Sequence, residues 1–197
     1  MQITAAALIA AGLAAGIGAL VALHLAPTGL SAVRNAVSQY GITSYRNGYR
    51  IQTIGYAVAG LGAAIGVSTL PGPVAIPAGL CLIFAAARAA ISWFPMDVPG
   101  GERTATGRRH GTLAAAAFVG AGLAAWQLAK LLRHDSLHPA IATASTAFAA
   151  LMTLTLIAMV ITVRSGHHRY FGLIERGFYL SMTAWLATVA VLLILPA

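Results

Sequence analysis

Four residues of the chain carry side chains that could share a metal ion: His24, Asp97, His110 and Glu175. Imidazole nitrogens and carboxylate oxygens are ligands that zinc accepts. No two of the four share a dense spacing such as H-x-x-x-H, so the pattern supports a metal site only weakly. A structural polar network of the same residues is the favoured interpretation, with no cofactor and a bound metal ion as the alternative.

Asp97 and His110 could also exchange protons, which makes them the candidate catalytic residues if the protein is an enzyme. The segment before and after Asp97 contains two prolines and two glycines, at 95, 99, 100 and 101, so its backbone is restricted. The sequence contains no G-x-S-x-G nucleophile motif and no glycine-rich phosphate loop. An acid/base pair without such a motif indicates no particular reaction.

Arg88 lies about two helical turns inside an apolar run that ends at Trp93 and Phe94. A charge within a membrane span usually faces the interior of the bundle and finds a partner there. We expect Arg88 to pair with Glu175 in the first place and with Asp97 in the second. The alternative is that its side chain extends to the lipid head groups.

The composition shows what kind of protein must position these residues. Of 197 residues, 59% are hydrophobic and 8% are charged, whereas an ordinary soluble domain carries roughly a quarter charged residues. Twelve Lys and Arg with four Asp and Glu cannot cover a water-soluble particle of this size. A soluble enzyme, a nucleic-acid-binding protein and a disordered tail are excluded, and an integral membrane protein is predicted.

Six apolar runs approach or exceed the roughly 20 residues that a membrane span needs. They cover residues 3–26, 51–70, 74–94, 111–132, 139–163 and 173–195. Helix is the state that satisfies the backbone in lipid, and the first run lacks the positive start of a signal peptide. We predict an all-α polytopic membrane protein, a bundle of six transmembrane helices forming one domain over residues 1–197.

A short interfacial helix is predicted in the first loop, residues 27–50. Its apolar residues follow helical spacing: Leu30, Val33, Val37 and Tyr40. Gly41 follows, where a helix C-terminus favours glycine. Three tyrosines, Tyr45, Tyr49 and Tyr56, then predict an aromatic belt at the membrane surface.

Nine of the twelve cations lie in or beside the first, third and fifth loops, residues 27–50, 95–110 and 164–172, and only Lys130 and Arg133 lie at the other face. By charge count alone, the three loops are cytoplasmic. Their natural partners are membrane lipids with anionic head groups, and no nucleic acid is expected. Arginine outnumbers lysine eleven to one in a chain rich in Ala and Gly, which favours a bacterial inner-membrane protein.

Three motifs resemble those of one family. Residues 37–41 read Val-Ser-Gln-Tyr-Gly, residues 94–97 read Phe-Pro-Met-Asp with His110-Gly111 downstream, and residues 172–176 read Gly-Leu-Ile-Glu-Arg with Trp185 downstream. They resemble, in order and place, the domain of unknown function 998 family of six-helix bacterial membrane proteins. The resemblance singles out Ser38, Tyr40, Pro95, Asp97, His110, Gly172 and Arg176 and implies no assigned activity.

The chain differs from many members of this family in two details. Glu175 stands where many relatives have Gln, and relatives commonly begin with a basic stretch that would turn the three loops outward. The orientation therefore stays open. Of two functions, we favour a non-enzymatic lipid-handling, transport-accessory or assembly role, with Ser38, Tyr40, Arg88, Glu175 and Arg176 as binding residues. The alternative is an intramembrane lipid hydrolase or head-group transferase using Asp97 and His110.

Overall fold

The computed structural model describes residues 1–134, 138–166 and 168–195, and within them the regular structure is helical. The long helices are α1 (Gln2–Leu25), α2 (Arg46–Val67), α3 (Ala75–Ile91), α4 (Ala105–His134), α5 (Pro139–Ser165) and α6 (Phe171–Leu192). Two short 3-10 helices, η1 (Val37–Ile42) and η2 (His168–Tyr170), lie in the first and fifth loops. The predicted all-α class is confirmed.

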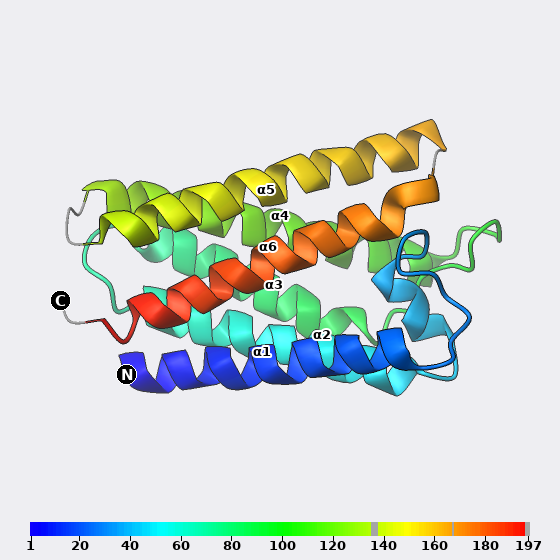
Figure 1. The fold of residues 1–197 in the computed structure, drawn as a ribbon, viewed down its shortest axis with the longest axis horizontal. Coiled ribbons are helices and arrows are strands. Elements are labelled where there is room, and N and C mark those ends of the chain that lie inside the picture. The colour runs from blue at the N-terminus through cyan, green and yellow to red at the C-terminus, as the bar shows by residue number, and fades with distance from the viewer. Residues whose placement is uncertain (135–137, 167, 196–197) are drawn as a thin grey trace.

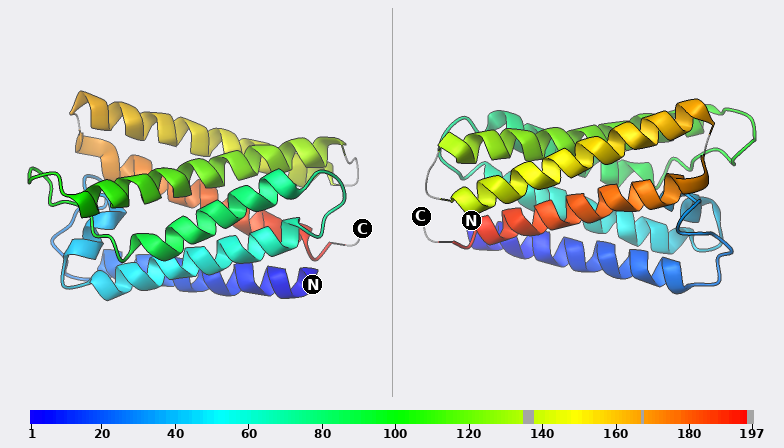
Figure 2. Two further views of the ribbon diagram at one scale, coloured as in Figure 1. Left: turned by 180° about the vertical axis from the view of Figure 1, so that it is seen from behind. Right: turned by 45° about the horizontal axis from the view of Figure 1, so that its top comes forward.

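The helices form an elongated bundle in which each one packs against the next along the chain (Figure 1). Helix α6 closes the bundle, because it packs against α1 and α2 as well as α5. Two further views show the first, third and fifth loops at one end and both chain termini at the other (Figure 2). We call the first of these the loop end.

Three helices of the described chain are long and apolar enough to cross a membrane: α1, α4 and α5. Helix α3 is apolar but has only 17 residues. Helices α2 and α6 have 22 residues each, but polar and charged residues dilute their apolar sequence. The structure thus shows helices suited to a membrane, while the predicted number of six spans is not established by length and composition.

Helices α1 and α2 approach each other closely through glycine. A Cβ atom on Gly12 would lie 2.5 Å from the backbone nitrogen of Ala59, and one on Gly55 would lie 2.5 Å from the backbone nitrogen of Gly16. Gly62 meets the backbone of α1 in the same way. Small residues of this kind let helix backbones touch, which is the usual way in which membrane helices pack.

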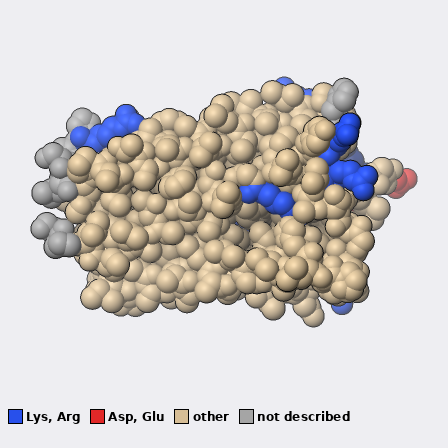
Figure 3. Space-filling model, in the orientation of Figure 1, with Lys and Arg blue, Asp and Glu red and all other residues tan. Residues whose placement is uncertain are grey.

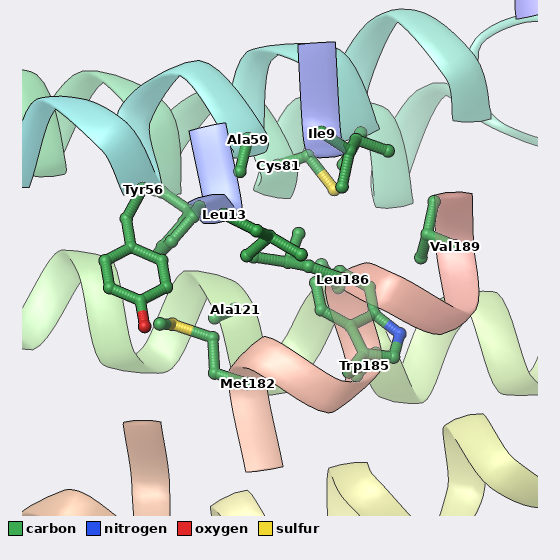
Figure 4. Packing of buried hydrophobic residues seen from close by; sticks show 14 of the residues in the cluster. Ile9, Leu13, Tyr56, Ala59, Cys81, Ala121, Met182, Trp185, Leu186 and Val189 are labelled. Atoms are coloured by element: carbon green, nitrogen blue, oxygen red, sulfur yellow. The ribbon is translucent and has the colours of Figure 1, made fainter. Parts of the chain in front are cut away.

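The core is made mainly of side chains from α6 and the helices around it (Figure 4). Met182, Trp185 and Leu186 of α6 are almost completely buried, as are Ile9 of α1 and Cys81 of α3. Close packing of such large side chains provides many van der Waals contacts, which hold α6 in place. The core lies between the loop end and the end with the termini, so it supports the structure that the three loops form.

Two expectations about the first loop are wrong. The helix there is only η1, it is a 3-10 helix, and Val37 and Tyr40 are buried in the protein rather than lying along a membrane surface. Gly41 lies within η1, at a position where the ring of Tyr49 leaves no room for a Cβ atom. Tyr49 and Tyr56 are 3% and 1% exposed, so they belong to the core and not to an aromatic belt.

Candidate functional site

A cavity of about 680 Å³ lies at the loop end. Its lining includes Arg34, Ser38, Met96, Gly100, His168 and Arg169 from the three loops, and Tyr49, Arg88, His110, Phe118, Glu175 and Tyr179 from the helices. On the face seen in Figure 3, Lys and Arg side chains also gather at this end. The three sequence motifs thus contribute to the walls of one cavity.

Arg88 is the most deeply buried charge of the cavity wall, with 2% of its surface exposed. Its Nη1 donates to the Tyr179 hydroxyl at 2.9 Å, and its Nη2 donates to Gln52 Oε1 at 2.8 Å. The guanidinium carbon also lies 5.7 Å and 5.4 Å from the ring centroids of Tyr56 and Tyr179. Such cation–π contacts stabilise a charge that has been removed from water.

The expected partners of Arg88 are therefore wrong, although its burial is as predicted. Within the described residues, no ion pair joins Arg88 to Glu175 or to Asp97, and its partners are neutral. The reason lies on α6: Tyr179 follows Glu175 by one helical turn and occupies the position facing Arg88. Gln52 and Tyr179 belong to no motif, and a glutamine inside an apolar run is the one sequence signal that points to this contact.

Glu175 is 4% exposed, and its carboxylate is directed to the first loop. Its Oε2 accepts the backbone N–H of Val37 at 2.7 Å. A charge-assisted bond of this kind fixes the carboxylate against η1. Glu175 also lines the cavity, so a negative charge lies in the same wall as Arg88.

Arg176, the neighbour of Glu175, does not line the cavity and instead joins α1, α6 and the first loop. Its Nε donates to His24 Nε2 at 2.6 Å, and its Nη1 donates to the carbonyl oxygens of Asn35 and Gly172, both at 2.9 Å. His24 Nδ1 then donates to the Leu20 carbonyl at 2.6 Å. Both ring nitrogens of His24 are thus engaged, which leaves none to bind a metal ion.

The first loop also meets α6 through its backbone. Leu173 donates its N–H to the Val33 carbonyl at 3.0 Å, one of three hydrogen bonds by which Val33, Asn35 and Val37 attach to the first turns of α6. A Cβ atom on Gly172 would lie 2.5 Å from the Asn35 carbonyl oxygen. Glycine in this motif therefore permits the loop to lie directly on the helix.

Asp97 and His110 have separate partners. Asp97 Oδ1 accepts the Thr104 hydroxyl at 2.6 Å, and the Thr104 oxygen accepts the N–H of Gly107, so Asp97 fixes the start of α4. His110 Nδ1 bonds to the Phe94 carbonyl at 2.7 Å and lines the cavity, whereas Asp97 does not. The residues are not arranged as an acid/base pair.

Among the described residues, no group of three or more His, Cys, Asp or Glu is placed to hold a metal ion. The four candidates instead have separate local partners, as outlined for His24, Asp97, His110 and Glu175. Ser38 and Tyr40 lie nearby: Ser38 Oγ donates to Met96 Sδ at 3.1 Å, and Tyr40 meets the His24 ring edge-on at 5.8 Å. Within the part of the chain that the structure describes these contacts are separate, so they do not join His24, Asp97, His110 and Glu175 into the single polar network that the sequence favoured.

The bundle contains helices that are long and apolar enough to cross a membrane, and it has a charged cavity at one end. These features place the protein in the class of helical membrane proteins. The chain belongs to the family described as "Protein of unknown function (DUF998)", whose model matches residues 8–192. The resemblance of the three motifs is thereby confirmed. No curated protein and no solved structure matches the chain.

Proposed function

We propose that the chain is a six-span protein of the bacterial inner membrane that binds the head group of a membrane phospholipid in the loop-end cavity, without chemical turnover. The observation that carries this proposal is the cavity itself, whose wall combines a buried arginine with other charged residues and with apolar side chains. Its volume of about 680 Å³ is in the range of small-molecule sites. It suits a head group with the adjoining part of an acyl chain.

The charges of the lining favour a ligand that carries a negative group. Arg34, Arg88 and Arg169 line the cavity, against one carboxylate, Glu175. Guanidinium groups bind phosphate through paired N–H donors. Apolar residues such as Phe118 continue the wall and would contact the chain of a lipid.

The exposed surfaces of α2, α3 and α6 support six spans. The polar side chains of these helices, such as Gln52, Arg88 and Glu175, are buried inside the bundle. Their exposed large side chains include apolar ones: Ile51, Ile54 and Leu61 on α2, Ile76, Leu82 and Ile83 on α3, and Leu173, Leu180 and Val191 on α6. An apolar exterior around a polar interior is what a bundle surrounded by lipid requires.

The enzymatic alternative, a hydrolase or transferase using Asp97 and His110, has less support. Asp97 is occupied with the first turn of α4 and does not line the cavity. An acid/base mechanism needs both groups within reach of the same substrate atom. Lipid binding needs no such convergence.

The test is to fill the cavity and measure bound lipid. Ala114 lines the cavity on α4, whereas its neighbour Ala115 is exposed on the outer face. We expect wild-type protein purified in detergent to retain phospholipid, seen by native mass spectrometry, and Ala114→Trp to retain about tenfold less, a loss of about 1.4 kcal/mol in binding. Ala115→Trp, which adds the same ring outside the cavity, should match the wild type.

Equal lipid content in the two tryptophan variants would show that the cavity is not the binding site. The phospholipid recovered from the protein after incubation should also be chemically unchanged. Steady formation of a cleaved or exchanged lipid would contradict the non-enzymatic role and favour the alternative.

A further inference from the structure

Arg88 and Glu175 place opposite charges in the wall of one cavity without pairing with each other. Each is held by a neutral group instead: Arg88 by the Tyr179 hydroxyl and the Gln52 carbonyl oxygen, and Glu175 by the Val37 N–H. Both side chains are more than nine-tenths buried. Burying a charge is costly unless it is paired, so two unpaired opposite charges in one cavity require an explanation.

Both residues have bonding capacity that the protein does not use. Among the described residues, Arg88 Nε is buried and has no hydrogen-bond partner. The carboxylate of Glu175 has one donor in the same part of the chain, the Val37 N–H, although a carboxylate can accept about four hydrogen bonds. The cavity wall thus contains an unused donor on Arg88 and unused acceptor positions on Glu175.

The two charges follow a definite order along the bundle axis. Arg88 binds Tyr179, which lies four residues further into α6 than Glu175, an axial step of about 6 Å. Glu175 is bonded to the first loop, so it lies nearer the loop end. A ligand whose acyl chains point toward the bundle centre therefore has its inner atoms at the level of Arg88 and its outermost atoms at the level of Glu175.

We infer that the head group bound in the cavity is an aminophosphate, with its phosphate at Arg88 and its ammonium at Glu175. This inference rests on the proposed lipid binding and narrows it from phospholipids in general to phospholipids with a primary amine. In such a lipid the phosphate lies next to the glycerol and the amine lies outermost, which is the order of Arg88 and Glu175. A head group with phosphate alone would supply no hydrogen-bond donor to the acceptor positions of Glu175 that Val37 leaves open.

The experiment compares lipids with identical acyl chains by native mass spectrometry of the full chain. We expect the wild type to bind phosphatidylethanolamine at least about tenfold more tightly than phosphatidylglycerol. Glu175→Gln should abolish this preference by weakening the binding of the ethanolamine lipid only. The side-chain carbonyl of the glutamine can still accept the Val37 N–H, so the first loop keeps its attachment. Glu102→Gln is the matched control, since Glu102 is exposed in the third loop and its replacement removes the same charge.

A second comparison changes the ligand instead of the protein. Phosphatidylcholine keeps the positive charge but has no N–H donor for Glu175, so we expect it to bind the wild type more weakly than phosphatidylethanolamine. Free glycerophosphoethanolamine should compete only weakly, because it lacks the acyl chains that contact the apolar wall.

The outcomes separate the two proposals. Equal binding of the ethanolamine and glycerol lipids by the wild type overturns the aminophosphate inference and leaves phospholipid binding intact. The same follows if Glu175→Gln weakens both lipids equally. If the wild type binds neither lipid, the proposed function fails as well.

Discussion

Arg88 is the residue whose surroundings say most about the site. A buried arginine bonded to a carboxylate would be a structural ion pair, and removing one partner would leave the other charge unpaired at a cost of about 3–5 kcal/mol. Here the partners are a hydroxyl and an amide oxygen. Neither is left charged if the guanidinium is removed, and the Tyr179 hydroxyl can then donate to Gln52.

This arrangement predicts that Arg88→Met does not destabilise the protein. Replacing a buried charge by an apolar side chain of similar volume is often neutral or stabilising by about 1–4 kcal/mol. We expect the thermal midpoint in detergent, measured without added lipid, to stay level or rise, while phospholipid binding is lost. A fall of several degrees in the thermal midpoint would instead show that Arg88 is needed for stability. Arg103→Met is the control, because it makes the same change at an exposed site.

The sequence is enough to place Arg88 inside the bundle but not to name its partners. Burial follows from the position of a charge within an apolar run. The partner depends on the position of α6 along its axis relative to α3, since Glu175 and Tyr179 lie on the same face of α6 at different levels and only one can meet Arg88. An axial shift of one turn leaves the hydropathy pattern unchanged.

At the scale of elements, close packing of α1 on α2 is the feature most open to test. A Cβ atom on Gly12 would collide with the backbone of Gly55 and Ala59, and backbone cannot move aside as a side chain can. We expect Gly12→Ala to destabilise the protein by about 1–3 kcal/mol, as overpacking does. Thermal unfolding in detergent measures the change.

Gly18 on the same helix is the control. A Cβ atom added to Gly18 would meet no other atom within 4 Å, so Gly18→Ala should be neutral or stabilise α1 by up to about 1 kcal/mol. If both alanine variants melt at the same temperature, the close approach of α1 and α2 is not as described.

Helix positions are predictable because apolar runs are long and helix is the state that lipid permits. The apolar runs place the starts of α2 and α4 five and six residues too late, since Arg46 and Ala105 begin these helices in polar sequence. Charged first turns give no hydropathy signal. The first loop resembles a surface helix in sequence because apolar spacing shows only that a side is buried, not whether lipid or protein buries it.

At the scale of the whole molecule, the two ends of the bundle differ in their number of cations, although Figure 3 shows Lys and Arg side chains at both ends. Nine cations in or beside the loops against two at the other end predict that the loop end faces the cytoplasm. Cysteine labelling can test this cleanly, because the one native cysteine, Cys81, is buried.

We expect an impermeant maleimide added to intact cells to label Thr69→Cys or Gly72→Cys in the connection between α2 and α3, and not Arg103→Cys in the third loop. The α2–α3 connection lies near the end with the termini, and Gly72 and Arg103 are both exposed. All three should react once the cells are opened. The reverse pattern would mean that the arginines serve the site rather than the topology.

The attachment of the first loop to α6 has a consequence for how the cavity exchanges its contents. Three hydrogen bonds join the first loop to α6, so the two must move together. They run from Leu173 to Val33, from Arg176 to Asn35 and from Val37 to Glu175. That wall cannot swing outward without breaking all three. Amide hydrogens at Val37 and Leu173 should accordingly exchange with deuterium far more slowly than the amide hydrogen of Gly100, an exposed residue of the third loop.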